Sequence, residues 1–194
     1  MIMERQLITM KYKFLDNSIP YTGKELRSCW IKEQSGLEGD AVAAFIGPAD
    51  VPIENMVDLE DVANNAPIKS DMMLHFIVEH FDMPLERGVH LQRLLVAIIY
   101  EELVKLGKGG YLERRGDDLY DTDRKLSVSI AAPSPKSICI HTALNISSEN
   151  TPVPTIGLND YNVEPTFFGS NVMKRYCEEV EGMAHACSKV RSIP

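Results

Sequence analysis

Apolar residues recur at helical spacing in three stretches of the chain. The pattern predicts helices over residues 70–82, 89–107 and 170–191, the first of which must end before Pro84. The middle stretch repeats leucine and isoleucine at steps of three and four residues, and Gly107 follows as its expected stop.

The expected C-terminal helix is amphipathic along its whole length. Its apolar positions step 3-4-3-4-3 along one face and are Met173, Tyr176, Val180, Met183, Cys187 and Val190. Such a stripe either covers a sheet or pairs two subunits, so a homodimer is an expectation that the pattern leaves open.

Four other apolar segments have the length and the flanking turns of strands. Residues 26–31 and 40–47 enclose a turn-rich segment and predict one hairpin, while 124–132 and 138–146 predict a second. Hairpin strands followed by separate helices favour an α+β fold with a mainly antiparallel central sheet flanked by helices. At this length we expect a single domain over residues 1–194.

The composition is that of a globular protein with an acidic surface. A net charge of −8 argues against non-specific binding to nucleic acid or anionic lipid, because both require a basic surface. No apolar run approaches the roughly 18 residues of a membrane span, and Glu4 and Arg5 interrupt the apolar N-terminus, unlike in a signal peptide. Four dispersed cysteines without a C-x-x-C pair predict reduced thiols. We therefore expect a soluble, cytoplasmic protein without membrane contact.

The second hairpin carries small polar side chains at alternate positions. Because successive side chains of a strand point to opposite faces, Lys125, Ser127 and Ser129 are expected on one face of its first strand. The corresponding set on its second strand is Cys139, His141, Ala143 and Asn145. This pattern fits either a sheet face in solvent or the floor of a pocket. Small residues leave room for a ligand and polar groups orient it, which favours the pocket.

Residues 92–146 resemble the biotin protein ligases. In that family a helix leads to Asp-Leu-Tyr, a short turn, Arg-Lys-Leu, and a later strand closed by asparagine. Here Asp118-Leu119-Tyr120 and Arg124-Lys125-Leu126 match the two motifs, and Asn145 matches the asparagine. The segment from "KLSVSI" to "HTALNI" is also similar to the lipoyl and octanoyl transferases of the same superfamily.

The whole chain, including "GDAVAAFIGPADV" and "MLHFIVEHF", also resembles an archaeal and bacterial family of unknown function. That family is placed in the biotin/lipoate protein ligase fold, which class II aminoacyl-tRNA synthetases share. The resemblance therefore implies the same α+β architecture that the strand and helix pattern predicts.

The ligase resemblance implies a nucleotide and a small carboxylate as ligands, with ATP and Mg²⁺ as cofactors. In such enzymes the carboxylate attacks the α-phosphate of ATP, and the acyl group then passes to an acceptor. The matching positions make Lys125 the amine that stabilises phosphoryl charge, and Asp118 the carboxylate that holds Lys125, an arginine or Mg²⁺. The residues expected to contact nucleotide or substrate are Arg115, Arg124, Ser127, Ser129, His141 and Asn145.

Differences from the ligase pattern support an alternative. Arg115, Gly116 and Asp117 stand where the family has Trp-Pro-Asn, and the first 60 residues lack its Gly-Arg-Gly-Arg-Arg-Gly adenylate loop. Residues 141–144 replace the family's Gly-Ile-Gly-Ile, and isoleucine precedes Gly157 where the octanoyl transferases carry their nucleophilic cysteine. A non-catalytic small-ligand-binding or regulatory module with the ligase fold is therefore the second hypothesis.

Three further groups could carry chemistry. His75 and Glu79 would share one face of the expected helix, where they could hold a metal. The acidic residues 58–61 could bind Mg²⁺ or Ca²⁺, although they lack the calcium-loop pattern. Cys139 lies next but one to His141, without an evident orienting acid. No metal site is assigned, because interfacial histidines, solvated loops and buried thiols show the same patterns.

Overall fold

A computed structural model of the chain describes residues 9–149, 151 and 153–193. Its strands are β1 (Lys11–Phe14), β2 (Ala41–Val51), β3 (Ile68–Phe81), β4 (Leu112–Arg115), β5 (Asp118–Asp121), β6 (Arg124–Lys125), β7 (Ser127–Pro133) and β8 (Ser137–Asn145). Its helices are α1 (Trp30–Ser35), α2 (Leu59–Ala63), α3 (Leu85–Lys105) and α4 (Pro165–Ser188), with short 3₁₀ turns η1 (Ile53–Asn55) and η2 (Leu158–Tyr161). Among these described helices, none is long and apolar enough to cross a membrane.

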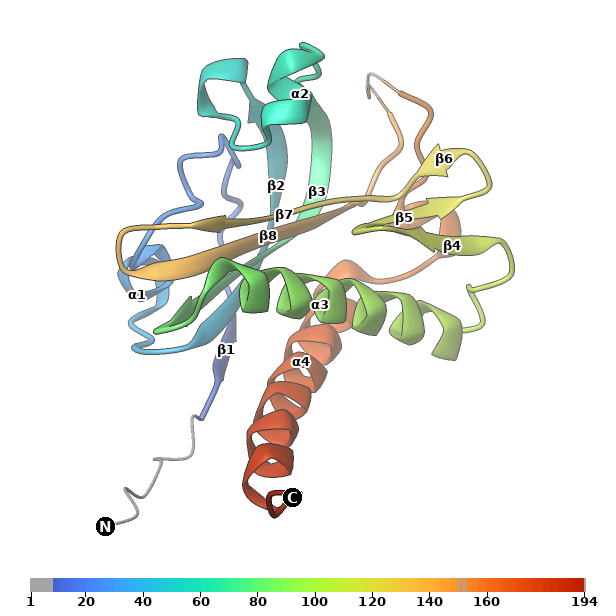
Figure 1. Ribbon diagram of the computed structural model, residues 1–194. Coiled ribbons are helices and arrows are strands. Elements are labelled where there is room, and N and C mark those ends of the chain that lie inside the picture. Colours follow the sequence, from blue (N-terminus) through green and yellow to red (C-terminus); the bar gives the residue numbers. More distant parts are fainter. Residues whose placement is uncertain (1–8, 150, 152, 194) are drawn as a thin grey trace.

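The main sheet of the described chain has the strand order β1-β2-β3-β8-β7 (Figure 1). β1 and β2 run parallel, and every other neighbouring pair in this sheet is antiparallel. β4, β5 and β6 form a small second antiparallel sheet. The predicted α+β class, with a mainly antiparallel central sheet and flanking helices, is confirmed.

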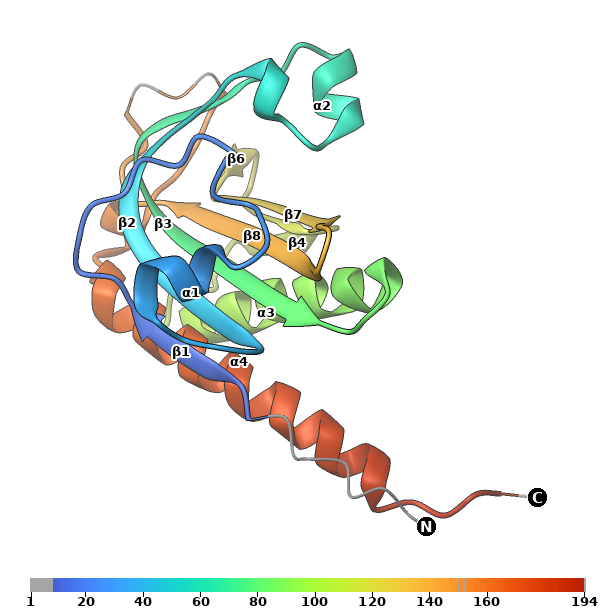
Figure 2. The ribbon, with the colours of Figure 1, turned by 90° about the vertical axis from the view of Figure 1, so that its left-hand side faces the viewer.

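The two long helices form where the apolar spacing predicts them. α3 packs against β7 and β8, and α4 packs against β1 and β2, on the same side of the sheet (Figure 2). Each helix begins earlier than predicted. α4 begins at Pro165 because the Glu164 carboxylate, not Ser170, caps it by accepting the N–H groups of Thr166 and Phe167.

The apolar stripe of α4 is buried only in its first half. Met173 and Tyr176 are fully buried in the core, whereas Met183 is 37% exposed, and Val190, which lies beyond the end of α4 at Ser188, is 70% exposed. Figure 2 shows the C-terminal part of α4 extending past the sheet. Pairing of two subunits through this second half stays a prediction.

Two of the predicted elements are wrong. The segment expected as a helix over 70–82 forms β3, the longest strand of the described chain. Both faces of β3 are buried over residues 73–80, so the apolar run there is nearly continuous, and periodicity alone does not separate such a strand from a buried helix. The segment 26–31, expected as a strand, is a turn that leads into α1, whose Trp30 and Ile31 pack in the core.

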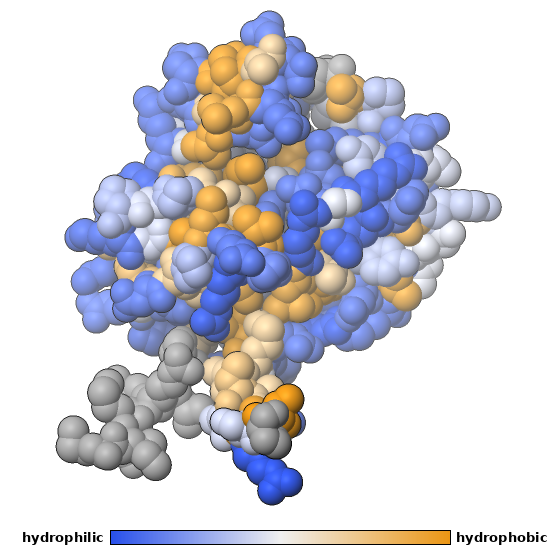
Figure 3. All heavy atoms as spheres, in the orientation of Figure 1, coloured by the Kyte–Doolittle hydropathy of each residue, from blue (hydrophilic) through white to orange (hydrophobic). Residues whose placement is uncertain are grey.

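The two faces of the sheet are covered differently. Phe76 and Val78 of β3 belong to the large core beneath α3 and α4, whereas Ile77 packs on the opposite face with Trp30 and Phe45. Towards β7 and β8 this opposite face is overhung by the segment that carries η1 and α2 (Figure 2). Figure 3 shows apolar side chains gathered over that segment. The overhang creates the space in which the candidate site lies.

Candidate functional site

Two adjoining cavities lie beside β7 and β8, one beneath the η1–α2 segment and the other between the start of β3, Tyr120 of β5 and residues 153–155. The smaller, of about 150 Å³, is lined by Tyr21 and His141 among others and is called the His141 cavity below. The larger, of about 350 Å³, is called the Asn145 cavity. The residues that line both, and so form their boundary, are Asp61, Ile68, Lys125 and Val128.

Lys125 lies on this boundary in a short ion pair. Its Nζ is 2.7 Å from Asp118 Oδ2, and the two side chains are 29% and 17% exposed. Burial opposes the charge on Lys125, but the Asp118 carboxylate outweighs burial and raises the pKa of the amine. Burial also raises the pKa of Asp118, to about 6, against the attraction of Lys125. The pair is therefore mostly ionised at neutral pH, and Asp118 gains a proton as the pH falls.

The surroundings of Asp118 are acidic. Its second oxygen, Oδ1, is buried and has no hydrogen-bond partner in the described part of the chain. Asp61 and Asp117 lie close enough for their charges to raise the pKa of Asp118 further. With Asp58, four aspartates line the His141 cavity beside one lysine, counting its described lining residues. This cavity therefore repels bare anions and attracts cations.

The two arginines expected at the site lie elsewhere. Arg124 pairs with Asp121 at 3.5 Å, and Arg115 pairs with Glu113 at 3.0 Å. The Arg115 guanidinium also lies 4.9 Å from the ring centre of Tyr120. Neither arginine is among the described residues that line the His141 cavity or the Asn145 cavity. Their predicted contact with phosphate would require both side chains to leave these partners.

The prediction that Ser127 and Ser129 share a face with His141 is wrong. In the register of β7 with β8, both serines lie on the face towards α3. The Ser127 hydroxyl accepts the backbone N–H of Leu119, and the Ser129 hydroxyl bonds to that of Thr142 at 2.8 Å. Ser129 still reaches the edge of the His141 cavity, whereas Ser127 is not among the described residues that line either cavity.

A change of strand pairing at Leu126 explains this difference. Lys125 pairs with Tyr120 of β5, and its backbone also bonds to Pro154 and Ile156. Two residues later the chain pairs with β8 instead, and Leu126 itself is buried in the core towards α3. The regular alternation of side chains between the two faces is therefore interrupted at Leu126, where the paired strand changes from β5 to β8. Lys125 therefore lines both cavities, whereas both serines face α3 and only Ser129 also reaches a cavity.

Asn145 lines the larger cavity and joins three segments. Its Nδ2 donates to the backbone oxygen of Lys125 at 3.3 Å, and its Oδ1 accepts from Ser70 Oγ at 3.2 Å. The amide thus holds the end of β8 against β3 and the Lys125 backbone. Its predicted contact with a ligand stays a prediction.

His141 belongs to a buried pair that sequence reasoning missed. His75 Nδ1 lies 3.0 Å from His141 Nε2, and His75 Nε2 lies 3.2 Å from the carbonyl oxygen of Gly47. The ring of Tyr21 stacks on His141 with centroids 3.7 Å apart. Burial lowers the pKa of His75 to about 4 and that of His141 well below its usual value, so both rings are neutral at pH 7. Reading residues 70–82 as a strand would have placed the two histidines on one face of neighbouring strands.

Glu79, the other half of the suggested metal pair, has a structural role. It accepts a hydrogen bond from the N–H of Cys29 at the start of α1 and another from Ser137 Oγ, both at 2.7 Å. His75 has other partners, so the two side chains do not converge on one ligand. Nowhere in the described residues do three or more metal-ligating side chains assemble.

The remaining candidates also have structural explanations. Asp58 caps α2 by accepting the N–H groups of Glu60 and Asp61. The Cys139 thiol is buried next to Ser137, and burial raises its pKa, which disfavours the reactive thiolate. The structure brings two members of the acidic run to the site, because Asp58 lines the His141 cavity and Asp61 lines both cavities.

Residues 10–191 match the family described as Domain of unknown function (DUF366). The chain belongs to the DUF366 family. The uncharacterized protein MJ0805 of Methanocaldococcus jannaschii is 35% identical over 160 residues, which cover 80% of this chain and 72% of that protein. The structure of a protein of unknown function from Pyrococcus horikoshi is 38% identical, with a TM-score of 0.89 over 95% of this chain and 100% of that one.

The DUF366 chain shares its fold with biotin and lipoate protein ligases. A biotin protein ligase from Aquifex aeolicus, in complex with biotin and ATP, has a TM-score of 0.56 at 14% identity, over 87% of this chain and 69% of that one. Ta0514 of T. acidophilum, regarded as a lipoate protein ligase and bound to lipoic acid, has a TM-score of 0.57 at 16% identity, over 88% and 85%. The predicted ligase-like fold is confirmed, and at these identities the likeness concerns the fold alone.

Proposed function

We propose that this protein binds a nucleotide and a small carboxylic acid in the two adjoining cavities and joins them as an acyl-adenylate. The observation that carries the proposal is the position of Lys125. This residue lines both cavities, and its Nζ is paired with Asp118 Oδ2 at 2.7 Å. A cation on this boundary can serve a phosphoryl group and a carboxylate together. Fold neighbours that hold biotin with ATP, and lipoic acid, support the same two classes of ligand.

The proposed reaction builds up charge where Lys125 can act on it. A carboxylate oxygen of the acid attacks the α-phosphorus of ATP, the bond from that phosphorus to the bridging oxygen breaks, and pyrophosphate leaves with the electron pair. Negative charge increases on the other oxygens of the α-phosphate. An ammonium fixed in a partly dry cavity stabilises this charge more than water does, and Lys125 is 29% exposed.

The acidic lining implies that a triphosphate would enter together with Mg²⁺. Asp118 Oδ1 is buried without a described partner, and Asp61 and Asp117 lie near it. Proteins often bind Mg²⁺ through one or two carboxylates plus the phosphates of a substrate, and Asp118 with one of these two neighbours would supply those carboxylates. The ion would supply charge neutralisation for the phosphates. The protein's own part is to offer carboxylates to the ion and, 2.7 Å from Asp118, the Lys125 amine to the phosphates.

Exchange of labelled pyrophosphate into ATP tests the adenylation step. We expect exchange that requires one of three added acids, namely biotin, lipoic acid or octanoic acid, and that falls about 10²- to 10³-fold in Lys125→Ala. The matched control is Lys136→Ala, which removes an exposed amine from the turn between β7 and β8 and should leave exchange unchanged. Exchange that survives Lys125→Ala would remove Lys125 from the mechanism.

A non-catalytic ligand-binding module is the second candidate, and the ion pair itself favours it. Asp118 already neutralises Lys125, and residues 1–60 lack the arginine- and glycine-rich loop of the ligases. Calorimetry with Mg²⁺-ATP and with the same three acids separates the candidates. Heat with an acid and none with ATP would support the module and reject adenylation.

A further inference from the structure

The buried histidine pair allows one arrangement of protons. A carbonyl oxygen can only accept a hydrogen bond, so His75 Nε2, 3.2 Å from Gly47 O, must carry a proton. Because His75 is neutral, its Nδ1 holds a lone pair, and His141 Nε2 must donate to it across 3.0 Å. A neutral His141 then has its own lone pair on Nδ1. One backbone carbonyl therefore fixes the tautomers of both rings.

The Nδ1 atom of His141 is open to the cavity. No group within residues 9–149, 151 and 153–193 hydrogen-bonds to this atom. Nδ1 is also not fully buried. Among the described residues, Asp118 Oδ1 is the one fully buried side-chain nitrogen or oxygen that lacks a hydrogen-bond partner. Because Nδ1 lacks a partner too and is not such an atom, part of its surface is accessible. The residue lines the His141 cavity and is otherwise only 2% exposed. An acceptor of fixed orientation is thus presented to the cavity by a nearly buried ring.

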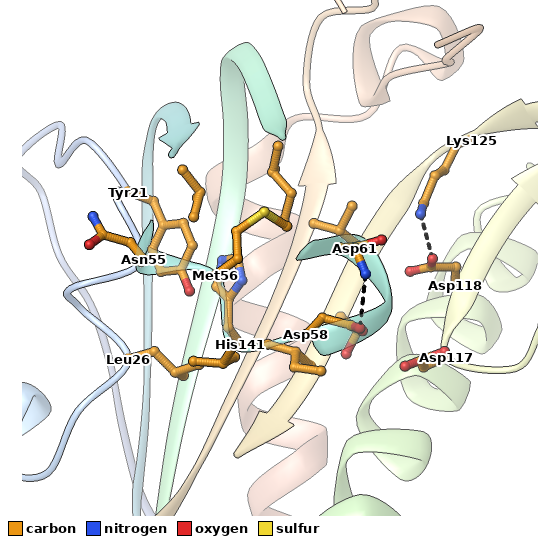
Figure 4. A pocket seen from close by; sticks show the side chains of 17 residues that line it. Tyr21, Leu26, Asn55, Met56, Asp58, Asp61, Asp117, Asp118, Lys125 and His141 are labelled. Atoms are coloured by element: carbon orange, nitrogen blue, oxygen red, sulfur yellow. Dashed lines mark hydrogen bonds and ion pairs between the residues drawn. The ribbon is translucent and has the colours of Figure 1, made fainter. Parts of the chain in front are cut away.

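The hydroxyl of Tyr21 supplies a hydrogen-bond donor at the same end of the cavity. The two rings stack face to face with an interplanar angle of 11°, and both residues line this cavity. The hydroxyl oxygen has no hydrogen-bond partner among the described residues and is not fully buried. Burial raises the pKa of Tyr21, which keeps the phenol protonated. Figure 4 shows Tyr21, Met56 and His141 at one end of the cavity, and Lys125 with Asp118 at the other.

We propose that Tyr21 and His141 bind a neutral ligand group in which an N–H donor adjoins a C=O acceptor, as in a lactam. His141 Nδ1 accepts the N–H, and the Tyr21 hydroxyl donates to the C=O. His75 is a positioning residue, since it fixes the tautomer of His141 without reaching the ligand. A carboxylate or phosphate is disfavoured at this end, because an oxygen that only accepts would face the lone pair of Nδ1.

The recognition of the amide-like group does not depend on the proposed function, whereas the description of the whole substrate rests on it. If the carboxylate of the acid lies at Lys125, the opposite end of the same cavity selects the amide-like group. The substrate class is then a small carboxylic acid with a neutral, amide-like group at its far end. The hydrogen-bonding half can be tested without any nucleotide, so its failure and the failure of adenylation are distinguishable.

Two-bond ¹H–¹⁵N correlation spectra of the histidine rings test the proton arrangement. We expect both His75 and His141 as the Nε2–H tautomer in the full chain. His80 is an internal control that should carry a proton on Nδ1, because this atom lies 2.8 Å from the Asp40 carboxyl group. In His75→Phe the His141 ring should lose its fixed tautomer and show a mixture. A proton on His141 Nδ1 in the unsubstituted protein would overturn the proposal.

Binding is tested with δ-valerolactam and with N-methyl-δ-valerolactam, which has the same ring but no N–H. The first should shift the His141 Nδ1 resonance and leave His80 unchanged, whereas the N-methyl compound should produce no shift. His141→Phe, which keeps an aromatic ring against Tyr21, should abolish binding of the lactam. Equal shifts with both compounds, or no shift with either, would overturn the proposed donor recognition.

Discussion

Two buried histidine networks lie on opposite faces of β3. On the side of α4, His80 Nδ1 lies 2.8 Å from Asp40 Oδ2 and its Nε2 lies 2.9 Å from the hydroxyl of Tyr176, so both ring nitrogens are used. On the side of the cavity, the chain from Gly47 through His75 ends at a nitrogen of His141 that has no described partner. The rings are equally buried, and only the second network is incomplete.

The difference shows how buried polar groups in one strand can be told apart. Nearly all buried polar atoms in folded proteins are paired, so a complete network is explained by stability alone. A network that ends in an unpaired atom at a cavity wall needs a partner from outside the chain. Completeness of hydrogen bonding, rather than burial or residue type, therefore separates the structural histidine from the candidate ligand contact.

The largest effect is expected on the closed side. His80→Phe leaves the Asp40 carboxyl group and the Tyr176 hydroxyl without their shared partner, so we expect the free energy of unfolding to fall by about 3 kcal/mol. Urea denaturation measures this loss. The His141 response to δ-valerolactam should persist in the folded fraction, and its disappearance would mean that the two networks are not independent.

His141→Phe should cost less stability, about 1–2 kcal/mol. It leaves one buried acceptor, His75 Nδ1, without a donor, while the stack with Tyr21 is retained. The same urea experiment compares it directly with His80→Phe. A loss as large as that of His80→Phe would indicate that the cavity-side network is as structural as the closed one.

At the charged end of the cavity, the pKa of Asp118 predicts a pH effect on anion binding. Because that pKa is raised to about 6, Asp118 becomes protonated as the pH falls from 7 to 5 and ceases to neutralise Lys125. Burial also raises the pKa of Asp61, which lines the same cavity. Sulfate, whose charge is constant in this range, should bind more tightly at pH 5 than at pH 7.

Asp118→Asn should remove most of this pH dependence and tighten sulfate binding about tenfold at pH 7.5, or roughly 1.4 kcal/mol. Calorimetry or chemical-shift titration of the Lys125 amine measures it. Asp123→Asn is the control, because Asp123 is an exposed residue of the other cavity. If both variants bind sulfate equally tightly, the effect is one of overall charge and not of the Lys125 pair.

The smallest effect is expected for Tyr176→Phe. It removes one hydroxyl from the closed network, keeps the ring in the core, and should lower the free energy of unfolding by about 1 kcal/mol. Thermal and urea unfolding would both detect it. A loss equal to that of His80→Phe would mean that the stabilisation by this network comes from the Tyr176 hydroxyl and not from the contact with Asp40.

Alternation in the sequence predicted the site where strand pairing is regular. β8 is one uninterrupted strand, so His141 and Asn145 were expected on one face, and each lines a cavity. The pairing of Asp118 with Lys125 was one of the three alternatives that the ligase motifs suggested for Asp118, beside an arginine and Mg²⁺. Ser127 was misplaced because the chain changes its strand partner at Leu126, a long-range event that local spacing does not record.

The misreading of β3 had the larger consequence for function. Its continuous apolar run looks helical because both of its faces are buried, and that burial depends on helices far away in the sequence. Treated as a helix, the segment relates His75 to Glu79. Treated as a strand, it places His75 beside His141, and only the three-dimensional register distinguishes the two.

Gly47 in β2 has a role that its size alone makes possible. A Cβ atom at this position would lie 1.9 Å from the carbonyl oxygen of Ile19, so any larger residue would push away the backbone that leads to Tyr21. The carbonyl of the same glycine accepts the proton of His75. The missing side chain of Gly47 thus lets the backbone that leads to Tyr21 approach, and the Gly47 carbonyl oxygen fixes, through His75, which nitrogen of His141 keeps its lone pair. Replacing Gly47 would therefore alter the proposed recognition without contacting the ligand.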